Sequence, residues 1–466
     1  DVIAREHNYR RRLFAGGALA LLTGSQLLLG HPSTFWLSSV VELLYALFLV
    51  LPWRNLRAYT TLGLAKTIGA LIGAVQLLPH WEAASDSVRQ SPSREFLLWP
   101  SVHPLHLLQL FAPYFYNDYA LDGLGHDVKT YTGAIPLALL VLLVVRWKHL
   151  GKWKGLATAA VSLGLISLVL AMGKYGYLYL LQTYLPLVGL LRTPCRYVLL
   201  FHFSLAIGAA IAFADISSTA ERGLCLSRRA LLPLLILPGM AAMPFVLMLV
   251  ARTHNDPTTA KYFIYGVNAQ KSMVIAGPAL FLLAATLALL AARGKRYAMF
   301  GIALFVLCDV FAYGVNFMGG GGNRTIEAVV NSFPTPVEDP RLYRIQSEDN
   351  IFIMKNARLA DGYASIPPKK KLDSYNPVRL KLANAHSMLA KNPLRFGGRA
   401  YGMRLSEPFP RARLMSRATV SRDPNKDINE VDVASTALVE HEVRLAGGPP
   451  GRATLVVDRP GAISVA

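Results

Sequence analysis

The stretch RYVLLFHFSLAIGAAIAFAD, residues Arg196–Asp215, decides the fold class of this chain. Between its two end residues it carries no charge and few polar side chains. A helix needs about 17 to 25 mostly apolar residues to cross the roughly 30 Å of hydrocarbon in a lipid bilayer. The stretch is therefore predicted to form a transmembrane helix.

Eight further stretches of this kind lie on both sides of Arg196–Asp215, and together they predict a polytopic α-helical membrane protein with about nine transmembrane helices. The segment Tyr175–Leu191 is also apolar, but Pro186 and Gly189 interrupt it. We expect a half-helix or a segment that lies on the membrane surface there. The eight stretches are Leu13–Leu29, Phe35–Leu51, Thr61–Leu78, Tyr131–Trp147, Gly155–Met172, Arg229–Ala251, Ser272–Ala292 and Tyr297–Phe317.

The composition excludes a water-soluble enzyme. Of the 466 residues, 53% are hydrophobic and only 16% are charged, against roughly 25% charged in an average soluble protein. The 48 Lys and Arg residues outnumber the 28 Asp and Glu residues and give a net charge of +20, but they recur in short clusters between apolar stretches. This pattern is typical of a membrane protein, and no nucleic-acid partner is expected. The three cysteines are too scattered for a disulfide framework or a structural zinc site.

The basic clusters also predict the orientation, because the cytoplasmic loops of membrane proteins collect Lys and Arg. With nine crossings every cluster falls on one side, which places the amino terminus inside and the carboxyl-terminal part outside. The outer side receives the short turn Gly30–Thr34, the long loop 79–130 and the segment Gly173–Thr193. The inner clusters are Arg10 to Arg12, Arg54 with Arg57, Arg146 to Lys154, Arg222 to Arg229, and Arg293 to Arg296.

The composition changes after Phe317. Four consecutive glycines, Gly319–Gly322, predict a flexible hinge. The polar sequence that follows holds short alternating stretches such as Ala453–Val457 and Ala462–Val465, which are typical of strands. The expected domains are a transmembrane helical domain, residues 1–318 with the outer loop 79–130, and an extracytoplasmic, mainly β domain, residues 319–466.

The outer loop 79–130 holds the first candidate site residues. Carboxylates and imidazoles near a bilayer surface could supply a general base or hold a divalent metal ion beside a phosphate. The alternative is a solvated loop, and the spacing fits no known metal site, so no metal ligand is assigned. The stretch Leu105–Tyr116 is expected to form an amphipathic helix on the lipid headgroups. The candidates are Glu82, Asp86, Arg89 and His103.

Two arginines near the start of the quoted stretch form the second candidate site. Arg192 and Arg196 flank Pro194, which can start a helix, and their forked donors suit a phosphate or pyrophosphate beside the helix amino terminus. Anchoring to the phosphates of ordinary membrane lipids is the alternative. His202, farther along the same helix, could ligate a cofactor or could be a buried, hydrogen-bonded histidine.

Asp309 lies inside the last apolar stretch. An ionisable group within a membrane costs a few kcal/mol, so it is a functional candidate by default. Asp309 could relay protons or pair with an arginine such as Arg192 or Arg196. A purely structural pairing is the alternative.

Several short segments follow one another in a recognisable order from the third apolar stretch to about Arg413. They are Gln76–Pro79 followed by Glu82 and Arg89, then Pro113–Tyr116, Tyr131–Leu137, Leu191–Arg196, Asp309 and Asp361–Tyr363. Each segment is short, so their order carries more weight than any single one. In this order they resemble the YfhO-like family of bacterial multi-spanning membrane proteins, which have GT-C-type glycosyltransferase architecture.

The resemblance implies a membrane glycosyltransferase of the bacterial cytoplasmic (inner) membrane. Such an enzyme takes a sugar from a polyprenyl-phosphate carrier on the outer face and adds it to a cell-envelope polymer or lipid. In GT-C-type proteins the catalytic acidic residue lies in the first long outer loop, whereas the first outer turn here, Gly30–Thr34, is short and has no carboxylate. We therefore expect the family's amino-terminal spans to precede Asp1 in a longer protein, and the carboxyl-terminal domain to stop early as well.

Two functions of different class remain as hypotheses, and neither has an assigned catalytic residue. In the first, a glycosyltransferase-like protein holds the carrier phosphate with Arg192 and Arg196, and Glu82–Arg89 lies near the acceptor. In the second, the chain is a non-catalytic structural subunit of a larger membrane complex, for example a photosynthetic or respiratory one. The expected partners are membrane lipids and the polyprenyl-phosphate sugar carrier in the first case, and other protein subunits in the second.

Overall fold

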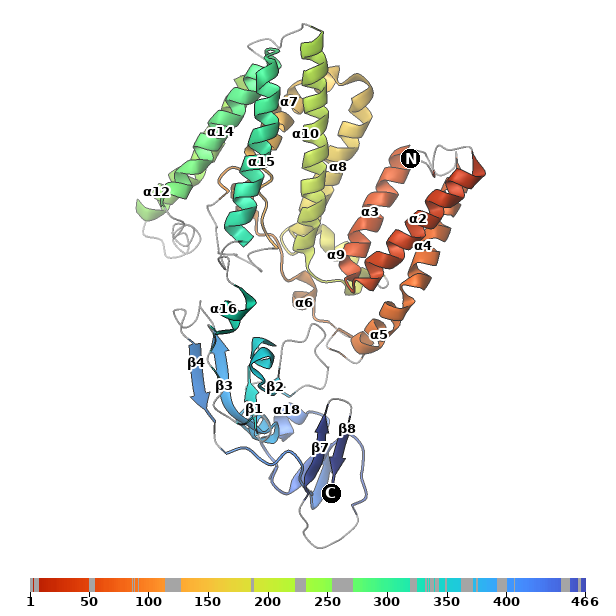
Figure 1. Ribbon diagram of the computed structural model, residues 1–466, viewed down its shortest axis with the longest axis vertical. Coiled ribbons are helices and arrows are strands. Elements are labelled where there is room, and N and C mark those ends of the chain that lie inside the picture. The colour runs from red at the N-terminus through yellow and green to blue at the C-terminus, as the bar shows by residue number, and fades with distance from the viewer. Residues whose placement is uncertain are drawn as a thin grey trace. The chain divides into compact units, whose positions relative to one another are not determined.

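The structure is a computed structural model of a predominantly helical chain, shown in Figure 1. The chain forms two compact units: a helical unit, Asp1–Trp81 with Pro92–Gly320, and a carboxyl-terminal unit, Glu82–Ser91 with Gly321–Ala466. The structure describes residues 3, 8–49, 55–85, 87, 89–90, 92–113, 127–185, 188–222, 232–253, 271–318, 325–331, 333, 335, 339, 343–347, 350–361, 372–373, 376–391, 400–405, 407–445, 453–459 and 462–466.

Each apolar stretch of the sequence contains a helix in the helical unit. The described residues of the interrupted segment Tyr175–Leu191 contain two short helices, α9 and η5, in place of one long helix. The α-helices are α2 (Tyr9–Leu28), α3 (Pro32–Leu49), α4 (Leu56–Ile72), α5 (Ala74–Ser85), α6 (Arg94–Leu98), α7 (Ala134–Val145), α8 (Lys154–Ala171), α9 (Leu178–Thr183), α10 (Val198–Glu221), α12 (Ile236–Thr253), α14 (Lys271–Ala292) and α15 (Arg296–Met318). The 3-10 helices are η2 (Pro104–Leu110), η3 (Trp147–His149), η4 (Gly151–Trp153), η5 (Val188–Leu190), η6 (Pro194–Tyr197) and η7 (Leu232–Leu235).

Four helical runs in the described residues are long and apolar enough to cross a membrane: α3, Gly151–Ala171, Pro194–Glu221 and Arg296–Val315. Helices α4 and α5 give a fifth candidate if they are counted as one span bent by 70°. By length and composition the described helices therefore give four or five candidate spans, and the count of nine stays a prediction. Helix α7, for example, has 12 residues, which is about 18 Å of helix. The unit nevertheless fits a multi-pass helical membrane protein.

Helices α2 and α4 pack closely because glycines leave room at their contact. A Cβ atom on Gly69 of α4 would lie 2.5 Å from Cβ of Thr23 in α2. Helix α4 is followed by Gly73, where a Cβ would lie 2.6 Å from Cβ of Leu27 in α2, and the chain bends there into α5. Small residues at a helix interface let two backbones approach, which is a common way for helices to associate in membranes.

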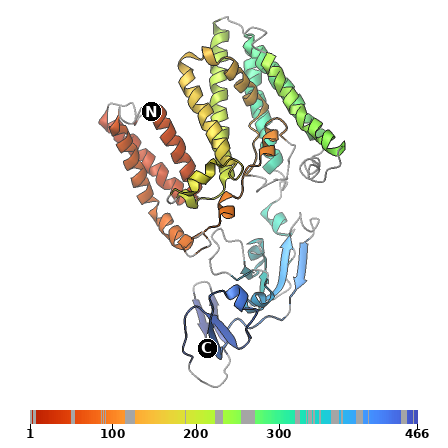
Figure 2. The same ribbon diagram turned by 180° about the vertical axis from the view of Figure 1, so that it is seen from behind.

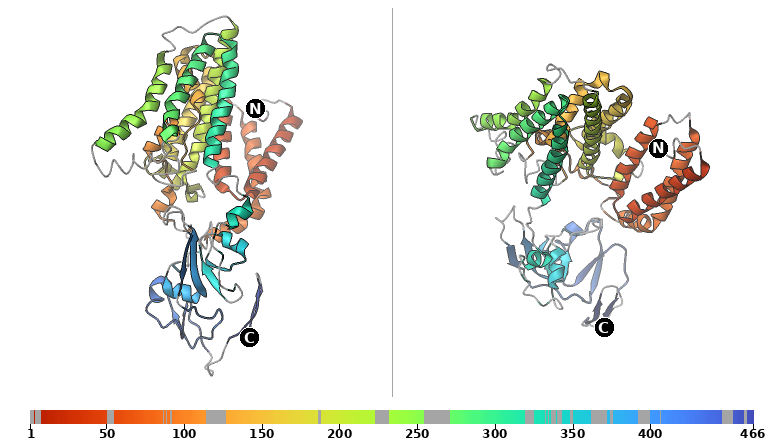
Figure 3. Two further views of the ribbon diagram at one scale, coloured as in Figure 1. Left: turned by 60° about the vertical axis from the view of Figure 1, so that its left-hand side comes forward. Right: turned by 45° about the horizontal axis from the view of Figure 1, so that its top comes forward.

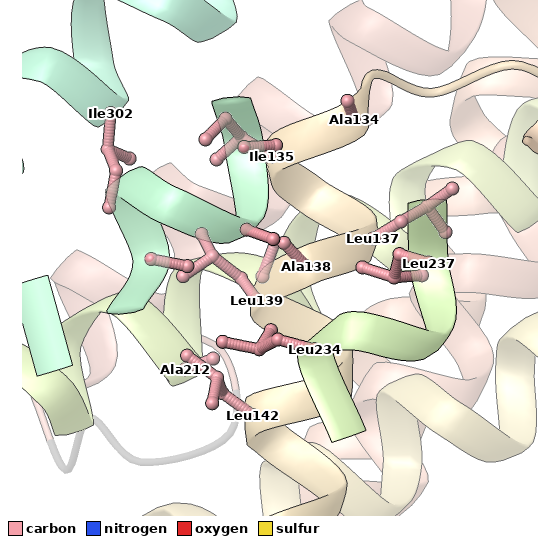
Figure 4. Packing of buried hydrophobic residues seen from close by; sticks show 14 of the residues in the cluster. Ala134, Ile135, Leu137, Ala138, Leu139, Leu142, Ala212, Leu234, Leu237 and Ile302 are labelled. Carbon is pink, nitrogen blue, oxygen red and sulfur yellow. The ribbon is translucent and has the colours of Figure 1, made fainter. Parts of the chain in front are cut away.

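Helix α7 forms the centre of the second group of helices. Helix α10 packs against α7, α8 and α14, and Figure 2 shows these helices from behind. Eight of the 12 residues of α7 are buried. Figure 4 shows Ile135, Leu139 and Leu142 of α7 packed among residues of the surrounding helices, including Leu234 of η7 and Ile302 of α15. The apolar sequence of α7 therefore serves the protein core rather than contact with lipid.

One end of this bundle, named the basic end here, gathers the basic residues that follow α7 and α14. Arg146 forms an ion pair with Asp215 near the end of α10, and its Nη2 donates a 3.1 Å hydrogen bond to the Thr219 hydroxyl. The turn between α14 and α15 lies beside the same end of α10, since a Cβ on Gly294 would lie 3.9 Å from Cβ of Ala220. The opposite end, which carries α6, η2, α9 and η6, is named the loop end.

The prediction of an amphipathic surface helix at Leu105–Tyr116 is wrong for the described part of that stretch. The chain forms the 3-10 helix η2 there, with His106 and Gln109 fully buried. The hydroxyl of Thr130 donates a 2.7 Å hydrogen bond to the carbonyl of His106, which ties η2 to a later loop. A surface-lying helix would expose these polar groups, whereas here tertiary packing buries them. Residues 114–116 lie outside the described residues.

The carboxyl-terminal unit combines short strands with short helices (Figure 3). A four-stranded sheet has the order β2-β1-β3-β4, in which β1 is parallel to both neighbours and β4 is antiparallel to β3. Strands β5 and β6 form a parallel pair, and β7 and β8 form an antiparallel pair at the two predicted strand positions. The elements are α16 (Ile326–Asn331), β1 (Arg344–Gln346), η10 (Asn350–Lys355), β2 (Leu359–Asp361), α17 (Pro377–Leu382), β3 (Ala385–Lys391), β4 (Ala400–Arg404), β5 (Arg417–Val420), α18 (Pro424–Asp427), β6 (Thr436–Val439), β7 (Leu455–Arg459) and β8 (Ala462–Val465).

Candidate functional site

The loop that carries Arg192 is held in place at the loop end by close backbone contacts. Thr193 has a positive φ of 80°, and Pro194 then starts η6, which runs into α10. The N–H of Cys195 donates a 3.2 Å hydrogen bond to the carbonyl of Pro100. Gly173 has φ +48°, and a Cβ there would collide with Ser101 and lie 2.7 Å from Cγ of Pro194. The backbone around Arg192 is therefore fixed by three segments of the chain.

Arg196 contacts the first turn of the chain, between α2 and α3. Its Nη1 donates a 2.7 Å hydrogen bond to Oγ of Ser33. Oγ of Ser33 and Oγ1 of Thr34 in turn lie 2.9 and 3.1 Å from Nδ1 of His31. The sequence alone gave no reason to join these residues, because Gly30–Thr34 lacks a carboxylate and is distant in the chain. The structure brings the turn to the arginine.

The pKa of His31 is also affected by a carboxylate from a third segment of the chain. Burial, and next the positive charge of Arg196, lower the pKa of His31, while the carboxylate of Asp127 raises it. Electrostatic influence of this kind requires short separations. Asp127, at the end of the loop 79–130, is thus electrostatically coupled to His31 in the first outer turn. This association is formed only in three dimensions and has no local sequence signal.

Arg192 lies over an aromatic ring. Its Cζ is 4.7 Å from the centre of the Phe96 ring in α6. Stacking on a ring leaves the edge donors of a guanidinium available for a second partner. Among the described residues no carboxylate forms an ion pair with Arg192 or Arg196, whereas Arg146 at the basic end is paired with Asp215. The two arginines thus add positive charge to the loop end.

A buried polar network lies beneath the arginines. Nε1 of Trp36 donates a 2.7 Å hydrogen bond to the hydroxyl of Tyr197, which donates to Oε1 of Gln182 in α9. The hydroxyl of Tyr179 donates a 2.6 Å hydrogen bond to the carbonyl of Leu191, beside Arg192. Burial raises the pKa of Tyr179, so its phenol stays protonated and keeps this bond at neutral pH. The network anchors the loop from α9 to η6.

His202 uses both ring nitrogens within the protein. Nε2 lies 3.0 Å from the carbonyl of Lys129, and Nδ1 lies 2.8 Å from Oγ1 of Thr132. A carbonyl can only accept, so Nε2 carries the proton and Nδ1 accepts from the threonine hydroxyl. The geometry fits the interpretation of His202 as a hydrogen-bonded structural histidine rather than a cofactor ligand.

The histidines of η2 are also engaged in the fold. Nδ1 of His103 accepts a 3.1 Å hydrogen bond from the N–H of Leu105, and its ring packs edge-on against Tyr175. Burial, then the charges of Lys129 and His103, lower the pKa of His106 to about 3, so His106 is neutral at pH 7. Within the described part of the chain no three His, Cys, Asp or Glu side chains are grouped to hold a metal ion.

Asp309 binds the start of α7. Its Oδ2 accepts a 2.9 Å hydrogen bond from the N–H of Ala134. Both carboxylate oxygens also face the hydroxyl of Tyr131. Gly133 has φ +107°, a conformation that brings Ala134 to the carboxylate without a side chain in between. A negative charge at a helix amino terminus is favourable, so Asp309 stabilises the central helix.

The remaining candidates of the loop 79–130 fall in different parts of the structure. Glu82 ends up with Arg89 in the carboxyl-terminal unit, whereas His103, Arg192 and Arg196 belong to the helical unit. Asp86 lies outside the described residues.

No family model, no curated protein and no solved structure matches the chain. The site at the loop end therefore has to be interpreted from its own chemistry. We use the name arginine site for Arg192, Arg196, Ser33, His31 and Asp127. These residues supply guanidinium groups, an imidazole and a carboxylate near the start of the run Pro194–Glu221, which is long and apolar enough to cross a membrane.

Proposed function

We propose that this protein binds a polyprenyl-phosphate-linked sugar at its loop end and transfers the sugar to a cell-envelope polymer or lipid. One observation carries the proposal: in the described residues Arg192 and Arg196 form no ion pair with a carboxylate, although Arg146 of the same unit does. A phosphate monoester or diester presents oxygens that match the forked donors of arginine.

The chemical surroundings support a phosphate that reaches the protein through the membrane. Arg196 stands at the start of the run Pro194–Glu221, which is long and apolar enough to cross a bilayer. A lipid-anchored phosphate meets such a position when its chain lies among the helices. The amino terminus of a helix adds partial positive charge there. The order of segments that resembles the YfhO-like family supports a polyprenyl chain as the anchor and a sugar as the cargo.

The transfer step that we propose uses Asp127 as the general base. An acceptor hydroxyl attacks the anomeric carbon, the bond from that carbon to the phosphate oxygen breaks, and the hydroxyl proton passes to the Asp127 carboxylate. Arg192 and Arg196 stabilise the negative charge that develops on the departing phosphate. His31, neutral because its pKa is lowered by burial and by Arg196, orients the Ser33 hydroxyl beside the guanidinium.

The proposed topology follows the charge distribution of the loops. The basic end lies on the cytoplasmic side of a bacterial cytoplasmic membrane, and the loop end lies on the outer side with the carboxyl-terminal unit. In this arrangement all nine apolar stretches lie in the membrane, including those whose helices are too short to cross it alone. The positive-inside rule supports the assignment, because the residues after α7 and α14 are rich in Lys and Arg.

The second candidate function is a non-catalytic structural subunit of a larger membrane complex. The observation in its favour is that His202, His103 and Asp309 are all engaged in hydrogen bonds that hold loops and helices together. In this case the arginine site would anchor ordinary lipid phosphates. The two functions differ in whether the site selects a polyprenyl phosphate and in whether Asp127 acts on a sugar.

The binding part of the proposal is tested by native mass spectrometry of the full chain in lipid nanodiscs, with polyprenyl phosphate and phosphatidylglycerol in competition. We expect a preference for polyprenyl phosphate that falls at least tenfold in Arg192→Gln/Arg196→Gln. The control Arg296→Gln removes an exposed charge at the basic end and keeps the preference. Equal binding of both lipids, weakened equally by the double substitution, would show ordinary headgroup anchoring and overturn the proposal.

The transfer part is tested with radiolabelled polyprenyl-phosphate hexoses and a bacterial envelope fraction as the acceptor. The full chain is expected to move label from the lipid to the acceptor, and Asp127→Asn is expected to abolish that movement while lipid binding is retained. Transfer that proceeds unchanged in Asp127→Asn contradicts the assigned base. Absence of transfer by the parent chain contradicts the transfer part of the proposal, and absence of transfer together with unselective lipid binding favours the structural subunit.

A further inference from the structure

The carboxyl-terminal unit contains a cavity of about 450 Å³ that we name the hairpin cavity. Leu455 of β7 and Val465 of β8 contribute to one wall, and the segment Arg411–Leu414 contributes to another. Arg344 of β1 and Asn384, which precedes β3, complete the part of the lining that matters here. The cavity thus lies among three separate structural elements of one unit.

Positive charge is concentrated at the hairpin cavity. Arg344, Arg411 and Arg413 line it, and no Asp or Glu is among its described lining residues. Burial, then the charge of Arg358, lowers the pKa of Arg344, and burial, then the charges of Arg344 and Arg358, lowers that of Arg411. These guanidinium groups are therefore close enough to repel one another. An anion bound among them would relieve this repulsion.

Arg413 is held in a fixed position at the cavity. Its Nη1 donates a 3.0 Å hydrogen bond to the carbonyl of Val433, and its Cζ lies 4.3 Å from the centre of the Phe409 ring. A guanidinium that is already oriented loses less conformational freedom when it binds a ligand. Its stacked geometry also leaves edge donors for an anion.

Asn384 adds an acceptor to this set of donors. The residue is 4% exposed, and its Nδ2 donates a 3.0 Å hydrogen bond to the carbonyl of Phe409. That bond fixes the amide orientation, so the remaining atom at the cavity is the oxygen. In the described residues Oδ1 of Asn384 has no hydrogen-bond donor. A buried acceptor of this kind is costly unless a donor reaches it.

We propose that the hairpin cavity binds a phosphate ester that carries a free hydroxyl group, such as a sugar phosphate or a glycerol phosphate unit. The phosphate oxygens lie among Arg344, Arg411 and Arg413, and the hydroxyl donates to Oδ1 of Asn384. A volume of about 450 Å³ accommodates a single such unit. The proposal does not depend on the arginine site of the helical unit.

A neighbouring cavity of about 700 Å³ shares Arg411 and Arg413 with the hairpin cavity but is also lined by Glu440. A carboxylate disfavours a second anion nearby. The phosphate is therefore assigned to the hairpin cavity, and the larger cavity offers room for an uncharged continuation of the ligand. A phosphate unit within a longer glycan fits this arrangement as well as a free sugar phosphate does.

The test is isothermal titration of the full chain in detergent with glycerol 3-phosphate, glucose 6-phosphate and inorganic sulfate. We expect one-to-one binding of a phosphate ester that is at least tenfold tighter than that of sulfate. Arg411→Gln and Asn384→Asp are expected to weaken it at least tenfold, the second because it places a negative charge in the cavity. Arg444→Gln, an exposed arginine of the same unit, should bind as the parent does.

The unfolding temperature, measured with and without the ester, tests binding in variants that fold poorly. The ester is expected to raise the unfolding temperature of the parent and of Arg444→Gln, and not that of Arg411→Lys, which keeps the charge but loses the fork. The proposal is overturned if no phosphate ester binds, if sulfate binds as tightly, or if Arg411→Lys and Asn384→Asp leave binding unchanged. Arg192→Gln/Arg196→Gln should retain ester binding, so failure of the arginine site is distinguishable from failure of the hairpin cavity.

A glycerol phosphate oligomer that binds at least tenfold more tightly than the monomer would identify a polymer as the source of the unit.

Discussion

The phenol oxygen of Tyr131 lies 2.9 and 2.8 Å from the two carboxylate oxygens of Asp309, so both oxygens face the phenol proton. One of these oxygens also accepts a hydrogen bond from the N–H of Ala134. The carboxylate thus joins α15 to the first residue of α7. Asp309 is 6% exposed, so each of these hydrogen bonds is protected from water. An acidic residue that the sequence marks as a functional candidate is here a tie between two helices.

Replacing Asp309 is expected to weaken the helical unit. Asp309→Ala leaves the Tyr131 hydroxyl and the Ala134 N–H without their acceptor and should lower the free energy of unfolding by about 2 to 3 kcal/mol. Asp309→Asn keeps one oxygen acceptor and should cost less. Thermal unfolding in detergent micelles measures both. An Asp309→Ala protein as stable as the parent would show that the contact contributes nothing.

The ion pair at the basic end gives a second prediction. Arg146 and Asp215 have side-chain exposures of 15% and 10%, and removing one partner of a buried pair leaves an uncompensated charge. Asp215→Ala should therefore destabilise the unit by about 3 to 5 kcal/mol. The double variant Arg146→Met/Asp215→Leu removes both charges and should recover most of that loss. If the double variant is no more stable than Asp215→Ala, charge compensation is not the cause.

Gly173 provides a test of the loop geometry. Gly173→Ala places a Cβ against Ser101 and Pro194 in a residue with φ +48°, and should cost about 1 to 3 kcal/mol. The matched control is Gly63→Ala in α4, where nothing lies within 4 Å of the added Cβ, and it should stabilise by about 0.5 to 1 kcal/mol. Equal effects of the two substitutions on the unfolding temperature would contradict the close contact at Gly173.

The lowered pKa of His106 leads us to expect that the protein loses stability in acid. Burial lowers its pKa from 6.5 to about 3 in the folded protein, so between these values the unfolded chain binds the proton and the folded chain does not. The contribution of the neutral form is complete above pH 6.5 and is lost as the pH falls, by about 1.4 kcal/mol per unit. His106→Gln removes this dependence. Unfolding of the two proteins at pH 7 and pH 5 should differ in slope; parallel slopes would show that His106 titrates normally.

The positions of the helices could be predicted from the sequence because long apolar stretches are a local property. The role of each helix in the fold could not be predicted from the sequence. Tyr131–Trp147 has the composition of a membrane span, but its helix α7 is short and enclosed by its neighbours. The backbone of Gly73, where the chain bends, lies close to Leu27, a residue of another helix. Such features are decided by tertiary packing, which leaves no periodic signal.

The candidate site was predictable in the same partial way. Arg192 and Arg196 stood out because they are paired residues at the start of an apolar stretch. Their surroundings, Phe96, Ser33 and Asp127, come from distant segments and carry no recognisable spacing. The link between the first outer turn and Asp127 could not be predicted, because only folding brings a later loop to that turn.

The enclosed position of α7 has a consequence for biogenesis. A helix of 12 residues, about 18 Å long, is too short to stop transfer through a translocation channel alone. It needs an interior already lined by other helices, among them α10, α14 and α15, which are all synthesised after it. Helix α7 is therefore expected to reach its final depth only after its successors have entered the membrane, so the order of assembly differs from the order of synthesis.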